Sequence, residues 1–190
     1  MVRLARGFTL LEVMVVLMIV GMLLSLVNLN FSDRAARQEA EQLAKRLTVA
    51  FNQYREEALF QNLDLGLVWH PERFALKVFY DIRLPSVVQG MSQEQVGQLQ
   101  DNPWAKGDLA LAESQSIPET LSLEIEVEGD EVEPVDDLDD EAPIPVIFFF
   151  SSDEYTPLAV TVRHPDDDTF ALRVFGDGVG PIRWEVMDEF

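Results

Sequence analysis

The chain contains no cysteine and only two histidines, His70 and His164, which stand far apart in the sequence. Without cysteine, neither a disulfide nor a thiolate metal site is available. The histidines do not belong to a His-Glu-x-x-His pattern, and no Gly-x-Ser-x-Gly segment marks a nucleophilic serine. We therefore expect no catalytic residue, no cofactor and no metal site, and a protein that is not an enzyme.

Basic residues are also few. Lys and Arg number 14 against 34 Asp and Glu, which gives a formal net charge of −20 and a sequence pI near 4.2. A surface of that sign repels a phosphate backbone. Nucleic acid is therefore not an expected partner.

Eleven of the acidic residues lie between Glu124 and Glu141. Such a run predicts a solvated, self-repelling loop between strands. Calcium binding is the alternative, because hard cations prefer clustered carboxylates. The run lacks the spacing and turn glycine of an EF-hand loop, so the solvated loop is favoured.

Charge is absent from Val13 to Leu29. As a helix, residues 8–29 would extend about 33 Å, close to the thickness of a bilayer core. A cleaved secretory signal would end in a small-residue site, which the Ser25-Leu-Val-Asn28 stretch does not provide. The run therefore predicts a transmembrane helix.

Glu12 lies near the start of this run, where a carboxylate costs about 2.5–3.5 kcal/mol. A plain signal anchor, with Arg3 and Arg6 held in the cytoplasm, would suffice as a membrane tether but leaves Glu12 unexplained. A purely structural role is open as well, since the start of a helix favours anions and a side chain there can reach the interface.

MVRLARG followed by FTLLEV resembles the processing site of the type IV pilin and pseudopilin family: a basic leader, a glycine, a phenylalanine and a glutamate in register. The resemblance implies cleavage after Gly7 by prepilin peptidase and N-methylation of Phe8. It also implies that Glu12, the fifth residue of the mature chain, pairs in the membrane with the Phe8 amine of a neighbouring subunit.

A second helical pattern follows the apolar run. Apolar residues recur at helical spacing on one face, and Glu41 and Lys45 form an acid-before-base pair on another. The face consists of Ala36, Ala40, Leu43, Leu47, Ala50, Tyr54 and Ala58, with Phe51 beside them. We expect one helix from Phe8 to about Gln61, with residues 62–66 as its end.

The remainder predicts strands, separated by turns at residues 71–73, 164–168 and 176–181. They are expected at residues 65–70, 74–80, 121–127, 146–150, 158–163, 170–175 and 182–186. Residues 146–150 form a continuous apolar run, which predicts a buried strand. Residues 86–118 show weak periodicity and are expected to be a connecting region.

The expected fold class is therefore α+β: a pilin-like long N-terminal helix, half transmembrane and half amphipathic, packed on an antiparallel β-sheet head. The expected parts are a leader (1–7), a transmembrane assembly helix (8–30), its amphipathic periplasmic continuation (31–62) and a β-rich head (63–190) with an acidic loop at 124–141.

Within the family, length and layout are most similar to the H-type minor pseudopilins of type II secretion (GspH-like). This implies a non-catalytic subunit near the tip of the pseudopilus, which supports protein export across the outer membrane. The implied location is the bacterial inner membrane, crossed once, with the head in the periplasm. The implied partners are major and minor pseudopilins, prepilin peptidase, the inner-membrane assembly platform and secreted substrates.

Two alternatives stay open. A FimT/FimU-like minor pilin of a type IV pilus would share the N-terminus, but DNA-uptake pilins need a basic surface, and loss of Arg3 and Arg6 with the leader takes the charge from −20 to −22. A membrane-tethered periplasmic binding protein or enzyme would not require Gly7, Phe8 and Glu12 together.

Overall fold

The computed structural model describes residues 9–107, 109, 115–136, 138, 143–165 and 167–188, with side chains described for these except 24–34, 167–169 and 188. The chain divides into two compact units, Met1–Gln38 and Glu39–Phe190. Helix α1 (Leu10–Gln61) contributes to both units. The expected helix is therefore present, and it ends where the sequence predicted.

The end of α1 is set by Asn62, whose φ of 54° lies in the left-handed region. The Leu63 N–H donates to the Ala58 carbonyl at 3.0 Å, and the Asn62 N–H donates to the Leu59 carbonyl at 3.4 Å. This is a Schellman cap, and asparagine tolerates the left-handed position better than most residues. The chain then turns directly into the first strand.

The first sheet, sheet A, has the strand order β3-β2-β1-β7, with β4 paired to β2, and all of its pairs are antiparallel. Its strands are β1 (Leu65–His70), β2 (Arg73–Phe79), β3 (Trp104–Ala105), β4 (Gln115–Ser116) and β7 (Ile147–Phe149). His70 pairs with Arg73, so Pro71 and Glu72 form the expected tight turn of the β1–β2 hairpin.

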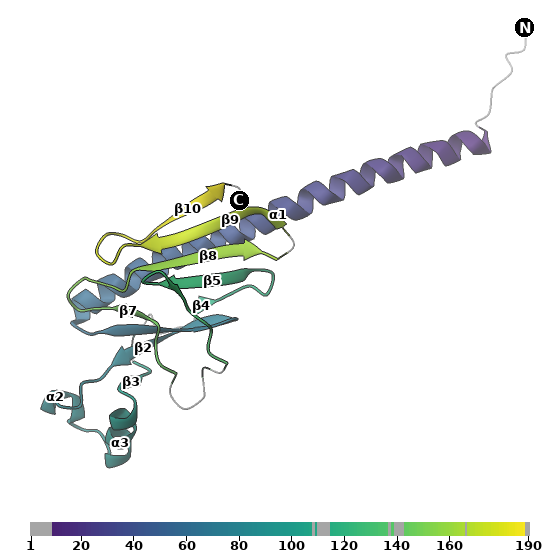
Figure 1. Ribbon diagram of the computed structural model, residues 1–190. Helices are drawn as coiled ribbons and strands as arrows, with labels where there is room; N and C mark the ends of the chain where they lie inside the picture. Colours follow the sequence, from purple (N-terminus) through teal and green to yellow (C-terminus); the bar gives the residue numbers. More distant parts are fainter. Residues whose placement is uncertain are drawn as a thin grey trace, which may run out of the picture. The chain divides into compact units, whose positions relative to one another are not determined.

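The second sheet, sheet B, has the order β10-β9-β8-β5-β6 and is also antiparallel. Its strands are β5 (Ser122–Val127), β6 (Asp130–Glu131), β8 (Leu158–His164), β9 (Asp167–Gly176) and β10 (Arg183–Asp188). In the unit Glu39–Phe190, Figure 1 shows the strands of both sheets along the C-terminal part of α1. The α+β fold predicted from the sequence is confirmed.

The core lies between α1 and the two sheets. Its α1 side is almost the face that the sequence predicted, with Ala44 added and Ala36 only half-buried. The buried α1 residues are Ala40, Leu43, Ala44, Leu47, Ala50, Phe51, Tyr54 and Ala58. Phe51 meets Phe74 of β2 edge-on at 5.8 Å, and Tyr54 meets Phe149 of β7 at the same centroid distance. Aromatic side chains from the helix and sheet A thus join in one cluster.

Arg55 connects α1 to two loops of the head. Its guanidinium forms a bidentate pair with Asp153, with both N···O distances at 2.8 Å, and donates to the Gly180 carbonyl at 3.0 Å. The Tyr155 hydroxyl donates to the same carbonyl at 2.8 Å. One turn earlier on α1, the Asn52 amide exchanges two hydrogen bonds with the backbone of Ile182. These contacts hold the β9–β10 connection against the helix.

The connecting region expected at residues 86–118 is more ordered than the sequence indicated. It contains α2 (Pro85–Val88) and α3 (Gln93–Asp101), besides β3 and β4. A capping box begins α3: the Gln95 N–H donates to Ser92 Oγ at 3.2 Å, and the Ser92 N–H donates to Gln95 Oε1 at 2.9 Å. The Ser-x-x-Gln spacing is the signal that could have predicted this helix.

The acidic run is not one loop. Glu124 and Glu126 lie in β5, where they pair with Arg163 at 3.3 Å and Arg173 at 3.6 Å. Asp130 and Glu131 form β6, after a turn at Glu128 and Gly129, whose φ values are positive. Farther on, the Val135 N–H donates to the Trp69 carbonyl at 2.9 Å, and Leu138 is buried. Residues 137 and 139–142 lie outside the described residues.

Two smaller expectations were also wrong. Strand β7 is not buried on both faces: Ile147 and Phe149 face the core, whereas Phe148 is half-buried and Phe150 is 37% exposed. The turn expected at residues 164–168 is shorter, because His164 ends β8 and Asp167 begins β9. Both differences depend on contacts with a neighbouring strand or ring, which the periodicity of the sequence does not reveal.

Candidate functional site

The three residues that the sequence singled out belong to the start of the chain. Gly7 and Phe8 lie outside the described residues, and Glu12 lies in the first turn of α1. Of these three residues, the structure therefore describes only Glu12.

Thr9 caps this helix. The Glu12 N–H donates to Thr9 Oγ1 at 3.2 Å, and the Val13 N–H donates to the Thr9 carbonyl at 3.2 Å. A threonine at this position satisfies one of the free amides of the first turn, and such a cap is worth about 0.5–2 kcal/mol. Thr9 and Glu12 have the Thr-x-x-Glu spacing of a capping box. Thr9 was not identified from the sequence, although this spacing could have revealed it.

The Glu12 side chain is exposed and forms no ion pair with any residue that the structure describes. Its position in the first turn is favourable by about 0.3–1 kcal/mol, because the helix dipole is positive there. The carboxylate is thus tolerated locally and is available to a cation from another molecule.

The described side chains that follow form a helix with apolar surface on every side. From Leu10 to Leu23, the large apolar side chains are between 44% and 79% exposed, apart from the gap at Gly21. A helix that is apolar all round requires cover from lipid or from other helices. The surface next to Glu12 is therefore one that other apolar groups must bury.

Within the described ranges, the structure contains no helix that is both long and apolar enough to cross a membrane.

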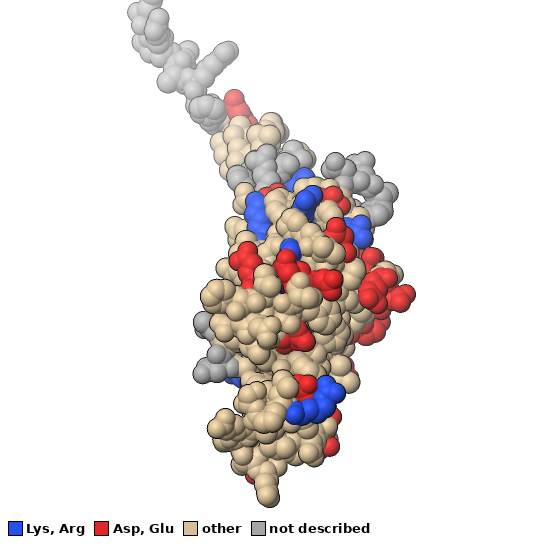
Figure 2. Space-filling view, turned by 90° about the vertical axis from the view of Figure 1, so that its left-hand side faces the viewer, with Lys and Arg blue, Asp and Glu red and all other residues tan. Residues whose placement is uncertain are grey.

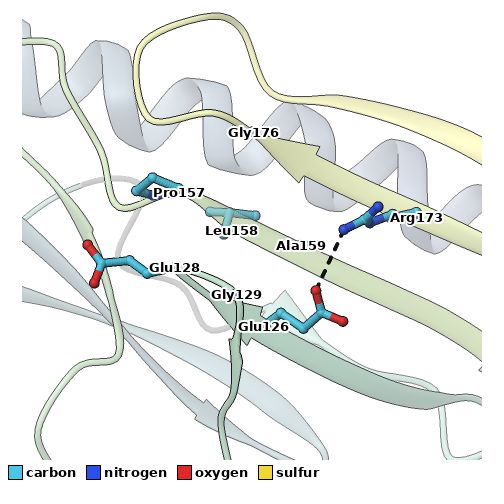
Figure 3. Close-up of a pocket in the computed structure, with 8 residues that line it drawn as sticks. All are labelled: Glu126, Glu128, Gly129, Pro157, Leu158, Ala159, Arg173 and Gly176. Carbon is cyan, nitrogen blue, oxygen red and sulfur yellow. Dashed lines mark ion pairs between the residues drawn. The ribbon is translucent and has the colours of Figure 1, made fainter.

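The head has a shallow groove of about 390 Å³ at one end of sheet B (Figure 3). Its walls carry Glu126, Glu128 and Arg173, and its floor includes Ala159 and Gly176. Arg173 is already paired with Glu126, and the Glu128 N–H donates to the Pro157 carbonyl at 2.9 Å. The groove lining contains no serine, cysteine, histidine or lysine that could act as a nucleophile or base.

The histidines stay apart. His70 ends β1 in sheet A and accepts the Glu72 N–H at 3.2 Å, whereas His164 ends β8 in sheet B. Among the described side chains, no group of three or more His, Cys, Asp or Glu is placed to hold a metal ion. On the face drawn in Figure 2, the acidic side chains lie in several separate groups, with basic side chains between some of them.

Residues 2–28 match the family model described as the prokaryotic N-terminal methylation motif. Most of the chain is similar to the type II secretion system protein H of Aeromonas hydrophila, with 26% identity over 186 residues, 93% of this chain and 91% of the relative. The matched motif contains Gly7, Phe8 and Glu12.

Solved structures share the fold. The minor pseudopilin EpsH from the type 2 secretion system of Vibrio cholerae aligns with a TM-score of 0.51 at 17% identity, covering 79% of this chain and 97% of that structure. The solution structure of E. coli GspH gives 0.52 at 15% identity, covering 80% and 90%. The resemblance to the pilin and pseudopilin family that the sequence indicated, and its pilin-like fold, are confirmed.

Proposed function

We propose that this chain is a non-catalytic minor pseudopilin of a type II secretion pseudopilus, in which it supports protein export across the outer membrane. The observation that carries the proposal is the start of α1. There a carboxylate that has no ion-pair partner among the described residues lies in a capped first turn, at the start of a helix segment with apolar surface on all sides. The methylation motif and the similarity to a type II secretion protein H support it.

The proposed processing separates residues 1–7 as a leader. Prepilin peptidase cleaves after Gly7, whose missing Cβ lets an active site approach the backbone closely. Phe8 becomes the new N-terminus and is methylated. In the proposed layout, residues 8–30 are the membrane and assembly segment, residues 31–62 continue the helix in the periplasm, and residues 63–190 form the head.

Glu12 then has a cation to meet. In lipid, an opposite charge within about 4–6 Å stabilises a carboxylate, and the Phe8 ammonium of an adjacent subunit provides that charge. The pair draws neighbouring helices into register. The exposed apolar side chains from Leu10 to Leu23 pack around it as subunits assemble.

The proposed location is the bacterial inner membrane, with the head in the periplasm and the mature subunit in the pseudopilus near its tip. The proposed partners are the other minor and major pseudopilins, prepilin peptidase, the inner-membrane assembly platform and secreted proteins. The structure of the described residues offers a folded head with paired charges rather than a reactive centre, which is consistent with an assembly role.

Processing tests the proposal directly. Gly7→Val should block cleavage, because the added side chain crowds the scissile bond, whereas the wild-type chain should begin at methylated Phe8. Intact-mass measurement distinguishes these species. Gly21→Val is a matched control within α1, where a new Cβ meets nothing within 4 Å, and it should be cleaved normally. A wild-type chain that still begins at Met1, or is cut near Asn28, would contradict the proposal.

A second measurement addresses the assembly. The tagged chain, extracted from membranes of the native bacterium, should co-purify with other pseudopilins. Co-purification with the subunits of a type IV pilus instead would assign the chain to that machine.

A further inference from the structure

A row of aromatic rings crosses the face of sheet A that is turned away from α1. Phe79 lies 5.2 Å from Trp104, Trp104 lies 5.4 Å from Phe148, and Phe148 lies 6.3 Å from Phe150, measured between ring centroids. The row therefore extends from β2 and β3 across to β7 and the residue that follows it. None of the four rings is fully buried, and Phe150 is 37% exposed.

Strand alternation places these rings opposite the core. In β2, Leu76 and Val78 are buried against α1, so Lys77 and Phe79 point to the other face. In β7, Ile147 and Phe149 are buried, and Phe148 and Phe150 point outward in the same way. The rings are thus a property of the outer face and are not part of the main core.

Gly66 makes room for the row. A Cβ at this position would lie 2.8 Å from the Trp104 ring and 2.6 Å from Pro145, so any other residue would displace these side chains. Gly66 pairs with Lys77 on one side and with Phe148 on the other. The backbone of β1 is thus covered by a ring that comes from β3.

Two lysines stand beside the rings. Lys77 is half-buried on β2, and Lys106 follows β3 directly and is exposed. Val78 pairs with Ala105, and the same antiparallel register, continued one residue past β3, places Lys106 opposite Lys77. The side chain of neither lysine forms an ion pair or a hydrogen bond with another residue of the described part, although the chain carries 34 acidic residues. Within the part of the chain that the structure describes, these two cations therefore have no acidic partner.

We propose that this face, consisting of Lys77, Phe79, Trp104, Lys106, Phe148 and Phe150, binds an acidic segment of another protein that carries aliphatic side chains. The lysines provide positive charge opposite the carboxylates of such a segment, and the rings provide apolar area for its aliphatic side chains. The rest of the chain, with its excess of carboxylates, repels the same segment and so directs it to this face. The inference goes beyond the proposed assembly role and does not depend on it.

Nucleic acid is the rival occupant, because rings beside cations also stack bases. The observations favour protein, since two lysines neutralise few phosphates and the net charge of −20 opposes the approach of a polyanion.

The probe is a twelve-residue peptide with the sequence of residues 130–141 of this chain, in which Val132, Val135 and Leu138 are interspersed among acids. Its control is the same peptide with every Asp and Glu replaced by Asn or Gln. Calorimetric titration into the full chain in non-ionic detergent should show saturable binding of the acidic peptide, at least tenfold tighter than that of the neutral one. Trp104 emission should change on binding, and the change should vanish in Trp104→Phe.

Charge variants locate the site. Lys77→Glu with Lys106→Glu should weaken binding at least tenfold, and Lys77→Gln with Lys106→Gln should weaken it less. Lys45→Glu with Arg83→Glu changes the net charge equally but lies elsewhere, and it should change the affinity less than threefold. Thermal melting of each variant verifies the fold.

Three results would overturn the proposal. These are the absence of saturable binding, an equal loss in the two charge-reversed pairs, and tighter binding of a twelve-residue oligothymidylate that depends on the same lysines. Concentration-dependent dimers of the full chain that dissociate in the Lys77/Lys106 variant would instead make a second copy the occupant.

Discussion

At the scale of single residues, Thr9 and Glu12 have separate tasks within one turn. The Thr9 hydroxyl accepts the backbone N–H of Glu12, so this bond does not use the Glu12 carboxylate. The helix start is thus stabilised by Thr9, and the carboxylate is left without a partner among the described residues. Substitutions at the two positions can therefore distinguish capping from charge pairing.

Glu12→Ala should leave insertion and cleavage at least as efficient as in the wild type, because it removes a charge from an apolar helix. Cross-linking to neighbouring pseudopilins should fall about tenfold, which corresponds to about 1.4 kcal/mol. Thr9→Val, the matched control, keeps the carboxylate and should preserve the cross-links. If both variants cross-link as the wild type does, the charge pair is absent; a loss with Thr9→Val alone would indicate that capping is what matters.

Tyr54 is a second residue with an unusual environment, because its polar hydroxyl lies in the core. Its side chain is 1% exposed, and its hydroxyl has no hydrogen-bond partner among the described residues. Burial raises the pKa of Tyr54, an effect that the nearby Gln115 side chain opposes. The hydroxyl is therefore desolvated without a bond of normal geometry to compensate.

Tyr54→Phe should accordingly leave the free energy of unfolding unchanged or increase it by up to about 1 kcal/mol. Tyr54→Ala should lower it by about 3–5 kcal/mol, because it opens a cavity among Phe51 and Phe149. Denaturant titration measures both. A loss of more than 1 kcal/mol in Tyr54→Phe would mean that the hydroxyl has a bound partner, such as an internal water molecule.

At the scale of secondary-structure elements, two bidentate arginine–aspartate pairs can be compared. Arg55 joins α1 to Asp153 and is 16% exposed, whereas Arg83 joins Asp81 two residues away and is 83% exposed. The Arg83 contact lowers the pKa of Asp81. Of the two pairs, only the first connects elements that are far apart in the chain. Arg55 also donates to the Gly180 carbonyl.

Arg55→Ala should lower the free energy of unfolding by about 1.5–3 kcal/mol, the usual contribution of hydrogen bonds to a charged group. Arg55→Lys should restore only part of it, since an ammonium cannot pair with both Asp153 oxygens while also reaching Gly180. Arg83→Ala should have no measurable effect, because exposed pairs contribute little. Equal effects at the two positions would show that the Arg55 contacts do not hold the loops to α1.

Much of the element order was predictable because its signals are local. The α1 core face, the β1–β2 hairpin and the alternation of β5 each follow a short period that one window of sequence contains. The Arg55–Asp153 pair and the outward position of Phe148 were not predictable, since each depends on residues far away in the chain. At the candidate site, Glu12 was found from its spacing to Gly7 and Phe8, and Thr9 was missed although its spacing to Glu12 was readable.

At the scale of the whole molecule, the main electrostatic feature is the large negative net charge. The head carries most of the chain's 34 acidic residues, and repulsion among them opposes the compact state. The residues Asp130, Glu131, Glu133 and Asp136 are all exposed. Leu138, in the same segment, is buried. Charge and packing within this segment therefore act in opposite directions.

Replacing these four acids by Asn or Gln should raise the melting temperature at low salt, because it removes repulsion between carboxylates. The melting temperature of this variant should also increase less with added NaCl than that of the wild type, because less repulsion is left for salt to screen. Leu138→Ala, which changes packing instead of charge, should lower stability by about 2–5 kcal/mol. Calcium should shift neither melting curve. A large calcium-dependent stabilisation, or a loss of stability on neutralisation, would show that the carboxylates bind a cation.

The arrangement of sheet A also determines the order in which the head can be completed. Strands β8, β9 and β10 pair as consecutive hairpins, and β1 pairs with β2 in the same way, but the other edge of β1 pairs with β7, which lies far along the chain. Closing that loop costs more entropy than forming any hairpin. The β1–β2 hairpin covers part of the α1 face, since Phe74 packs against Phe51, but the part that Phe149 covers stays exposed on a nascent chain until β7 has been synthesised. A chaperone that binds exposed apolar helices should therefore cross-link more strongly to ribosome-bound chains that end before β7 than to chains that include it.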